Sequence, residues 1–219
     1  MRIKVCGLTR QQDVDAAARL GADFCGFIFH PASPRYISPA AAARLESGGM
    51  ARVGVFVEQG AEEILAIMAE ARLDYAQLHG AQLHGAQLHG AQDHACAERI
   101  GPSRVIRVLW PERYAARAEL VADMAAHADA CALFLLEAGH AGGGSGRPQD
   151  WTRLAGLASP RPWLLAGGLS PLNVASAVAA CAPDGLDFNS GVEEAPGKKS
   201  PDLLAAALAA AAGDLGEKP

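Results

Sequence analysis

The sequence lacks the features of several protein classes. Lysine and arginine number 19 against 24 aspartate and glutamate residues, which gives a net charge of -5. Phosphate binding needs clustered basic residues, so nucleic acid is not an expected partner. No apolar run reaches the roughly 18 residues that a membrane-spanning helix needs, so no membrane partner is expected either.

Closely spaced cysteine pairs are also missing. The five cysteines are Cys6, Cys25, Cys96, Cys131 and Cys181. Their spacing does not suggest a disulfide framework, and reduced thiols in a cytoplasmic protein are expected. The opening residues MRIKVCGLTR contain no hydrophobic region of a signal peptide, which agrees with a cytoplasmic location.

Short apolar runs alternate with amphipathic, alanine-rich segments along the chain. We expect strands at residues 3–8, 24–29, 53–57, 75–80, 105–110, 132–137, 163–166 and 186–190. Helices are expected at 12–20, 39–46, 61–72, 93–100, 112–127, 150–157, 171–181 and 201–212. The apolar runs are continuous, as in parallel strands that are covered on both faces.

Eight such units in 219 residues predict an α/β fold, a single (β/α)8 TIM barrel over residues 1–219. A doubly wound sheet is the alternative. It usually has fewer units and a GxGxxG turn after its first strand, where this chain has CGLT. The glycine-rich stretch 140–148 could be a flexible linker, but it follows a strand directly, where a barrel places functional loops.

The carboxyl ends of the strands should carry the chemistry of such a barrel. Cys6 ends the first strand and offers a base, Glu137 ends the sixth and offers an acid, and Arg35 follows the second. Two glycine-containing turns, AGGL and NSGV, follow the seventh and eighth strands. Backbone N–H groups there, with a helix that starts at Ser170 as N-cap and Pro171 as first residue, predict a phosphate site. A phosphorylated sugar substrate is therefore expected.

Each candidate also has a purely structural interpretation. Cys6 could be a small buried core residue, and Arg35 could be a solvated loop charge. Glu137 could simply pair with Arg107 at the end of the fifth strand. The functional interpretation depends on the three residues occurring together at one end of the predicted barrel.

Six ordered motifs span nearly the whole chain. They are KVCGLT, GFIFHPASPRYIS, QLHG, LLEAGHAGGGSGRPQDW, LLAGGLSPLNV and DFNSGVEEAPGKKSPD. Together they resemble phosphoribosylanthranilate isomerase, a single-domain (β/α)8 enzyme of tryptophan biosynthesis. The resemblance implies an Amadori rearrangement of N-(5-phosphoribosyl)anthranilate to 1-(o-carboxyphenylamino)-1-deoxyribulose 5-phosphate, with no cofactor and no metal.

The resemblance also implies a role for each matching residue. Cys6 corresponds to the general base that removes the C2′ proton, and Glu137 to the general acid that protonates the ring oxygen. Arg35 corresponds to the partner of the anthranilate carboxylate. The remaining substrate-binding positions are Gly167, Gly168, Asp187, Ser190 and Gly191. The oligomeric state is left open between monomer and homodimer.

The chain departs from the family pattern at the acid position, where Glu137 replaces an aspartate. The intrinsic pKa values of the two carboxyls differ by only about half a unit. The extra methylene moves the carboxyl by roughly 1.5 Å, and such a displacement can cost on the order of 100-fold in rate. Further departures are Gln149 before the Asp-Trp pair, Ser200 for an acid, and Phe188 and Asn189 for smaller residues.

Other functions remain as alternatives. A catalytically weakened barrel that binds phosphate or a metal is one of them. A ribulose-phosphate epimerase fits less well because it needs metal-ligating histidine and aspartate at strand ends. A histidine-pathway isomerase is expected to have an aspartate where this chain has Cys6.

The unit AQLHG occurs three times in succession, at residues 76–90. Five residues advance a helix by about 500° and change the face of a strand. His79, His84 and His89 therefore share no face, which weakens a metal-binding interpretation. We expect the first copy to form the fourth strand, and the others to extend the following loop or helix at small cost. Because the copies are identical, a shift of one unit would restore the same contacts.

Overall fold

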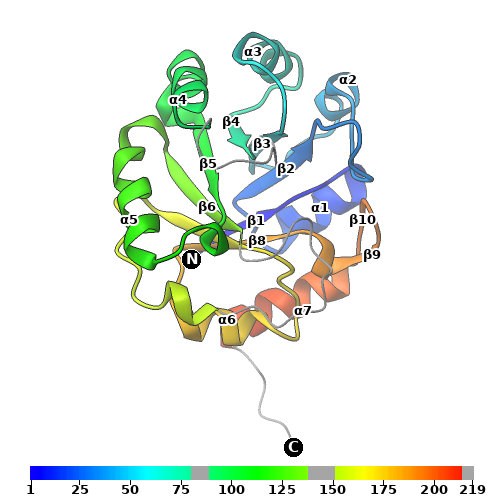
Figure 1. The fold of residues 1–219 in the computed structure, drawn as a ribbon. Helices are drawn as coiled ribbons and strands as arrows, with labels where there is room; N and C mark the ends of the chain where they lie inside the picture. The colour runs from blue at the N-terminus through cyan, green and yellow to red at the C-terminus, as the bar shows by residue number, and fades with distance from the viewer. Residues whose placement is uncertain (80–88, 138–150, 214–219) are drawn as a thin grey trace, which may run out of the picture.

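The computed structural model describes residues 1–79, 89–137 and 151–213, with only the backbone at 89–93. Eight parallel strands form a closed barrel in chain order (Figure 1), which confirms the predicted fold. They are β1 (Arg2–Val5), β2 (Phe24–Ile28), β3 (Ala51–Phe56), β4 (Tyr75–Leu78), β5 (Val105–Leu109), β6 (Leu133–Glu137), β7 (Trp163–Ala166) and β8 (Gly185–Phe188). The barrel closes where β1 pairs with β8, and Lys4 lies opposite Asp187 in that pairing.

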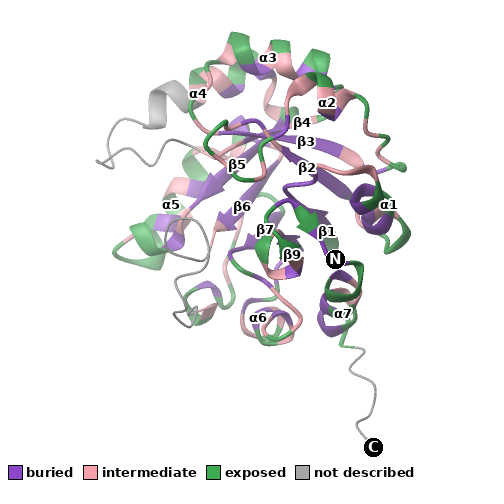
Figure 2. Cartoon of the chain, turned by 90° about the vertical axis from the view of Figure 1, so that its right-hand side faces the viewer, coloured by how far each residue is buried: buried purple, intermediate pink, exposed green. Residues whose placement is uncertain are grey.

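Helices surround the barrel. They are α1 (Gln11–Arg19), α2 (Pro39–Ala43), α3 (Ala61–Glu70), α4 (His89–Ile100), α5 (Arg117–Ala126), α6 (Val174–Cys181) and α7 (Pro201–Ala211). Short 3-10 helices are η1 (Pro102–Arg104), η2 (Pro111–Arg113), η3 (Ala128–Ala130), η4 (Trp151–Leu154) and η5 (Ser190–Val192). Figure 2 shows buried strands at the centre and helices whose outward faces are exposed. Within the described ranges, no helix is long and apolar enough to cross a membrane.

Several predicted helices differ from the structure. The helix predicted at 112–127 begins only at Arg117, after the 3-10 turn η2, and the one predicted at 39–46 ends at Ala43. The segment predicted as a helix at 150–157 contains only the 3-10 turn η4, which ends before Gly156 in the left-handed region at φ 62°. The helix after β7 begins at Val174 with Asn173 as N-cap, so the prediction of Ser170 and Pro171 was wrong by three residues. The Asn173 side chain accepts a hydrogen bond from the Ser170 N–H at 2.8 Å. The Asn173 N–H donates to the carbonyl of Ser170 at 3.2 Å, so residues 170–173 form a turn that precedes the helix.

Alternate residues of each strand contact different parts of the core, as strand geometry requires. The barrel interior contains a cluster formed by Phe24, Val53, Ile106, Val108, Leu133, Leu135, Leu164 and Ala166. The residues that alternate with these along each strand, such as Phe134 and Leu136, point outward and belong to the larger core that includes the helices. Arg107 lies between Ile106 and Val108, so its side chain points toward the helices and not toward Glu137.

The first copy of the repeat forms β4. Ala76, Gln77 and Leu78 pair with Gly54, Val55 and Phe56 of β3, as expected from the sequence. Residues 80–88, which hold most of the second and third copies, lie outside the described residues. Helix α4 begins at His89, inside the third copy.

A small antiparallel sheet follows β8 and was not anticipated. It consists of β9 (Glu193–Ala195) and β10 (Lys198–Lys199). Gly197 between the two strands has φ 76°, which glycine adopts without strain. Ser200 then caps α7, and its hydroxyl accepts a hydrogen bond from the Leu203 N–H. The unusual residue at position 200 therefore has a local structural role.

Candidate active site

A cavity of about 470 Å³ opens at the carboxyl ends of the strands. Seven of the eight predicted site residues line it: Cys6, Arg35, Glu137, Gly167, Gly168, Asp187 and Ser190. Gly191 is not in the lining. A Cβ at position 191 would lie 2.1 Å from the carbonyl oxygen of Leu169, so Gly191 allows the loops after β7 and β8 to touch.

A second cavity of about 520 Å³ lies between α3 and the loop after β2. Its rim includes the carboxylates of Glu58, Glu63 and Glu70, which are exposed. It contains neither Cys6 nor Glu137, although it is slightly larger. The cavity at the barrel mouth is therefore the better candidate, because it combines acid, base and cationic groups.

Cys6 directly follows β1, and its N–H donates a hydrogen bond to the carbonyl of Phe188 at 2.8 Å. Gly26 on β2 leaves room for the thiol, because a Cβ there would lie 3.0 Å from Cys6 Sγ. Burial raises the pKa of the Cys6 thiol, and the positive charge of Lys4 lowers it by a smaller amount. The thiol form is therefore favoured at neutral pH, and ionisation depends on a neighbouring cation.

Lys4 and Asp187 form a buried ion pair beside Cys6. Lys4 Nζ lies 2.9 Å from Asp187 Oδ2, and the two side chains are 0% and 7% exposed. Burial lowers the pKa of Lys4, but the carboxylate of Asp187 and the neighbouring Cys6 raise it, and the net change is upward. Lys4 is thus a permanent cation. Within the described residues, Asp187 Oδ1 is buried without a hydrogen-bond partner.

Glu137 ends β6 and lines the same cavity. The pKa of its carboxyl is raised to about 7: burial is the largest cause, Asp187 also raises it, and Lys4 lowers it. A carboxyl with this pKa holds a proton at neutral pH and can donate it. Since Arg107 points toward the helices, the alternative pairing of Glu137 with that residue does not occur.

Arg35 is tied to the hairpin after β8 rather than solvated. Its Nε donates to Glu193 Oε1 and Oε2 at 2.9 and 3.0 Å, and its Nη2 donates to Oε2 at 2.7 Å. Lys199 Nζ lies 2.6 Å from Glu193 Oε1. Burial raises the pKa of Glu193, but hydrogen bonds from Arg35 and Lys199 outweigh it and the net change is downward. Glu193 is therefore a stable carboxylate.

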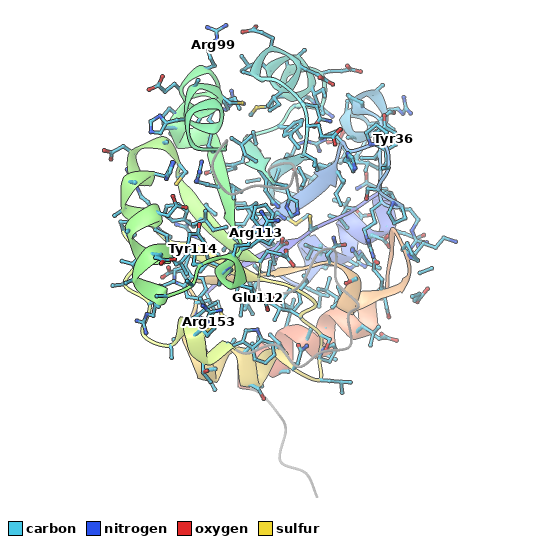
Figure 3. All side chains as sticks on the ribbon, viewed as in Figure 1. Tyr36, Arg99, Glu112, Arg113, Tyr114 and Arg153 are labelled. Carbon is cyan, nitrogen blue, oxygen red and sulfur yellow. The ribbon has the colours of Figure 1, made fainter. Side chains whose placement is uncertain are left out.

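The opposite wall carries aromatic and polar groups from β4 and β5. The rings of His79 and Trp110 meet edge to face, with centroids 5.3 Å apart. Arg113, labelled in Figure 3, lies with its guanidinium 4.1 Å from the Trp110 ring centroid. Burial, with nearby positive charges, lowers the pKa of His79 to about 4, so its imidazole is neutral. His79 Nδ1 and Gln77 Oε1 are buried without partners in the described part of the chain.

The loops after β7 and β8 pack against each other at one end of the cavity. Gly167 and Gly168 have φ values of 110° and 65°, a conformation that other residues rarely adopt. Ser190 starts the short helix η5. This arrangement brings two glycine-containing turns together, which suits close approach of an anion to backbone N–H groups.

Three charged residues of this region were not predicted from the sequence: Lys4, Glu193 and Lys199. Lys4 and Lys199 are buried, and a charge in a buried strand is a signal that could have identified Lys4. Over residues 1–79, 94–137 and 151–213, no group of three histidine, cysteine, aspartate or glutamate side chains could hold a metal ion.

The chain is similar to proteins of one family. The family model of N-(5'phosphoribosyl)anthranilate (PRA) isomerase matches residues 3–86 and 81–210, two segments that overlap within the repeat. The N-(5'-phosphoribosyl)anthranilate isomerase of Desulfovibrio desulfuricans is 63% identical over 218 residues, 100% of this chain and 99% of the relative.

Solved structures agree with this similarity. The phosphoribosyl anthranilate isomerase of Thermotoga maritima has a TM-score of 0.78 at 33% identity, covering 97% of this chain and 99% of that chain. A phosphoribosyl anthranilate isomerase in complex with reduced 1-(o-carboxyphenylamino)-1-deoxyribulose 5-phosphate has a TM-score of 0.74 at 31% identity, with the same coverage.

Proposed function

The chain belongs to the N-(5'-phosphoribosyl)anthranilate isomerase family, and from this premise we propose how its residues perform the reaction. The reaction is the Amadori rearrangement of N-(5'-phosphoribosyl)anthranilate to 1-(o-carboxyphenylamino)-1-deoxyribulose 5-phosphate, a step of tryptophan biosynthesis. The observation that carries the assignment is the convergence of Cys6 and Glu137 on one cavity. Burial raises the pKa of the Cys6 thiol and that of the Glu137 carboxyl from their different ordinary values, so the two groups bind protons in different pH ranges.

Glu137 acts first, as general acid. Its protonated carboxyl donates to the furanose ring oxygen while the C1′–O4′ bond breaks and the nitrogen lone pair forms a C1′=N iminium bond. The pKa of about 7 supports this role, because a substantial fraction of the carboxyl carries a proton at neutral pH.

Cys6 acts second, as general base. Its thiolate removes the C2′ proton, and the electrons of that C–H bond form a C1′=C2′ bond while the iminium nitrogen regains its lone pair. The resulting enol becomes a ketone when the hydroxyl at C2′ loses its proton and C1′ gains one. Glu137 ends as a carboxylate and Cys6 as a thiol, so one proton must return from Cys6 to Glu137 before the next turnover.

Arg35 is proposed to bind the anthranilate carboxylate. Glu193 occupies the Nε–Nη2 edge of the guanidinium, so the ligand would meet its other edge. The ion pair fixes the guanidinium in place, which lowers the entropic cost of binding.

The sugar phosphate is proposed to bind between the loops after β7 and β8. Gly167, Gly168 and Ser190 line that end of the cavity, and Gly191 permits the contact between the loops. Asp187 Oδ1, buried and facing no partner in the described residues, would accept a hydrogen bond from a sugar hydroxyl. A cytoplasmic location is proposed on the five free cysteines.

The direct test is turnover of freshly prepared phosphoribosylanthranilate by the wild-type chain and by Cys6→Ser and Glu137→Gln. We expect turnover by the wild type and losses of at least about 100-fold in each variant. Unchanged rates in both variants would refute the acid–base pair. Failure of the wild-type chain to turn over substrate, or to restore growth without tryptophan to cells lacking this isomerase, would refute the function itself.

A further inference from the structure

Lys4 is a buried charge with no role in the acid–base scheme above. Its side chain is 0% exposed and is held by one carboxylate, Asp187. A buried ion pair gives little net stability compared with apolar residues of similar volume. The position of this pair inside the barrel therefore calls for an explanation other than stability.

The geometry places the ammonium group beside the thiol of Cys6. Lys4 and Cys6 are two residues apart at the end of β1, so their side chains point to the same side of the sheet. A Cβ built on Gly26 would lie 3.0 Å from Cys6 Sγ and 3.3 Å from Lys4 Cε. Both side chains thus pass over the same glycine, which leaves them the space to lie side by side.

We propose that Lys4, held in place by Asp187, is the positioning residue that stabilises the thiolate form of Cys6. The inference rests on the proposed role of Cys6 as general base. The proton balance of the reaction explains the need for it, since each turnover must start with a thiolate at Cys6 and a proton on Glu137. A fixed cation beside the sulfur stabilises the thiolate at Cys6. It therefore favours this arrangement over the reverse one, a thiol at Cys6 and a carboxylate at Glu137.

The other charged groups around Cys6 have smaller or opposing effects. On the pKa of the thiol, burial has the largest effect and raises it; Lys4 follows and lowers it; Asp187 raises it; and Lys199, from the hairpin after β8, lowers it. Across the cavity, Lys4 also lowers the pKa of Glu137 and that of His79 on β4. Lys4 is therefore the cation with the largest effect on Cys6.

The test measures alkylation of Cys6 by iodoacetamide as a function of pH, followed by the mass of the peptide that contains Cys6. In Lys4→Met the Cys6 rate at a fixed neutral pH should fall on the order of 100-fold, because a unit charge at contact distance is worth about two pKa units or more. The double variant Lys4→Met/Asp187→Asn should show a smaller fall in the same direction, because the loss of Asp187 itself lowers the pKa of the thiol. It leaves no unpaired buried carboxylate, so it tests the proposal even if the single variant does not fold.

Arg52→Met is the matched control. Arg52 is also a buried cation, 7% exposed, but it donates to carbonyls of Ala42, Leu45 and Ala71 on the outside of the barrel. Its loss should lower the melting temperature and leave alkylation of Cys6 unchanged. If the role of Lys4 were purely structural, the Lys4 variants would also show a lower melting temperature with unchanged alkylation of Cys6.

Unchanged alkylation in Lys4→Met and in the double variant would overturn the inference, even if the wild-type chain is an active isomerase. An inactive wild-type chain whose Cys6 alkylation still depends on Lys4 would instead refute the proposed function while supporting the effect of Lys4 on the thiol. Addition of a small alkylammonium ion to Lys4→Ala should raise the alkylation rate again, with no effect on the Arg52 variant.

Discussion

Arg35 and Glu193 join the loop after β2 to the hairpin after β8 through a bidentate ion pair. The side chains are 17% and 4% exposed, so the pair is shielded from water. It connects the second and the last units of the barrel, and Arg35 itself lines the cavity. Breaking it should therefore affect binding of the ligand as well as stability.

Glu193→Gln is expected to raise KM about 10-fold, equivalent to about 1.4 kcal/mol, with a smaller change in kcat. The amide can still accept hydrogen bonds, but it no longer neutralises Arg35 and Lys199, so the guanidinium is less well positioned. Steady-state kinetics measure this. Glu194→Gln changes the exposed carboxylate next in sequence and should change neither constant. Equal effects of the two substitutions would contradict the assignment.

The raised pKa of Glu137 predicts that both activity and stability decline as pH rises toward and above 7. The acid form is lost as pH rises through about 7, so kcat should decline above that pH. The folded-state pKa exceeds the unfolded value, so the folded chain binds this proton more tightly and loses stability as pH rises from the unfolded value to about 7.

Glu137→Gln should therefore stabilise the protein above pH 7 by on the order of 1–3 kcal/mol, while reducing kcat by roughly 100-fold or more. Melting temperatures at acidic and alkaline pH check the first effect. The gain should vanish at acidic pH, where the glutamate is already protonated. A gain of equal size at both pH values would show that the carboxyl is not desolvated as described.

Gly26→Ala should reduce kcat on the order of 100-fold. The new Cβ would lie 3.0 Å from both Cα and Sγ of Cys6, so the thiol must move. Gly60→Ala is the matched control, because no atom lies within 4 Å of its new Cβ and its φ of -79° is accessible to alanine. Kinetics of the two variants under identical conditions give the comparison, and a fully active Gly26→Ala would exclude this tight packing.

Arg52→Lys should destabilise the fold by about 2–4 kcal/mol without changing kcat. The guanidinium donates to three carbonyls, of Ala42, Leu45 and Ala71, and lies 4.8 Å from the Phe27 ring centroid. An ammonium group cannot reach all of these acceptors at once. Urea unfolding measures the loss. Arg44→Lys changes an exposed side chain close by in the sequence and should have little effect.

Removal of two AQLHG units should leave the barrel intact and kcat within about 10-fold of the wild-type value. The first copy supplies β4, and any deletion of ten residues from the repeat gives the same sequence. The loop-closure term changes by only about 0.6 kcal/mol for each doubling of loop length. Circular dichroism and kinetics of the shortened chain test this expectation, and loss of folding would show that the additional copies support the barrel.

The barrel could be predicted from the sequence because the pattern that indicates each strand or helix lies within a short stretch of neighbouring residues. Continuous apolar runs and amphipathic segments recur eight times, and each run corresponds to a strand within a few residues. The positions of Cys6 and Glu137 followed from the same pattern, since Glu137 ends β6 and Cys6 comes directly after β1. Boundaries such as the start of α6 were harder, because residues 170–173 form a separate hydrogen-bonded turn before the helix.

The partners of the site residues could not be predicted, because they depend on contacts between distant segments. Lys4 pairs with Asp187, 183 positions away, and Arg35 with Glu193, 158 positions away. Arg107 was considered as a partner of Glu137, but it lies within β5 and strand parity turns its side chain outward. These pairings depend on strand register and on the position of the hairpin after β8. Neither can be read from the order of apolar and polar residues along the chain.

The pairing of Lys4 with Asp187 also has a consequence for the order in which the enzyme acquires activity. Cys6 and Lys4 are among the first residues to be synthesised, while Asp187 belongs to the last strand of the barrel. A nascent chain that ends before β8 leaves the ammonium group without its carboxylate and Cys6 without a fixed cation. The arrangement of charges beside Cys6 is therefore completed only when the last strand closes the cylinder, so activity is acquired at the end of folding.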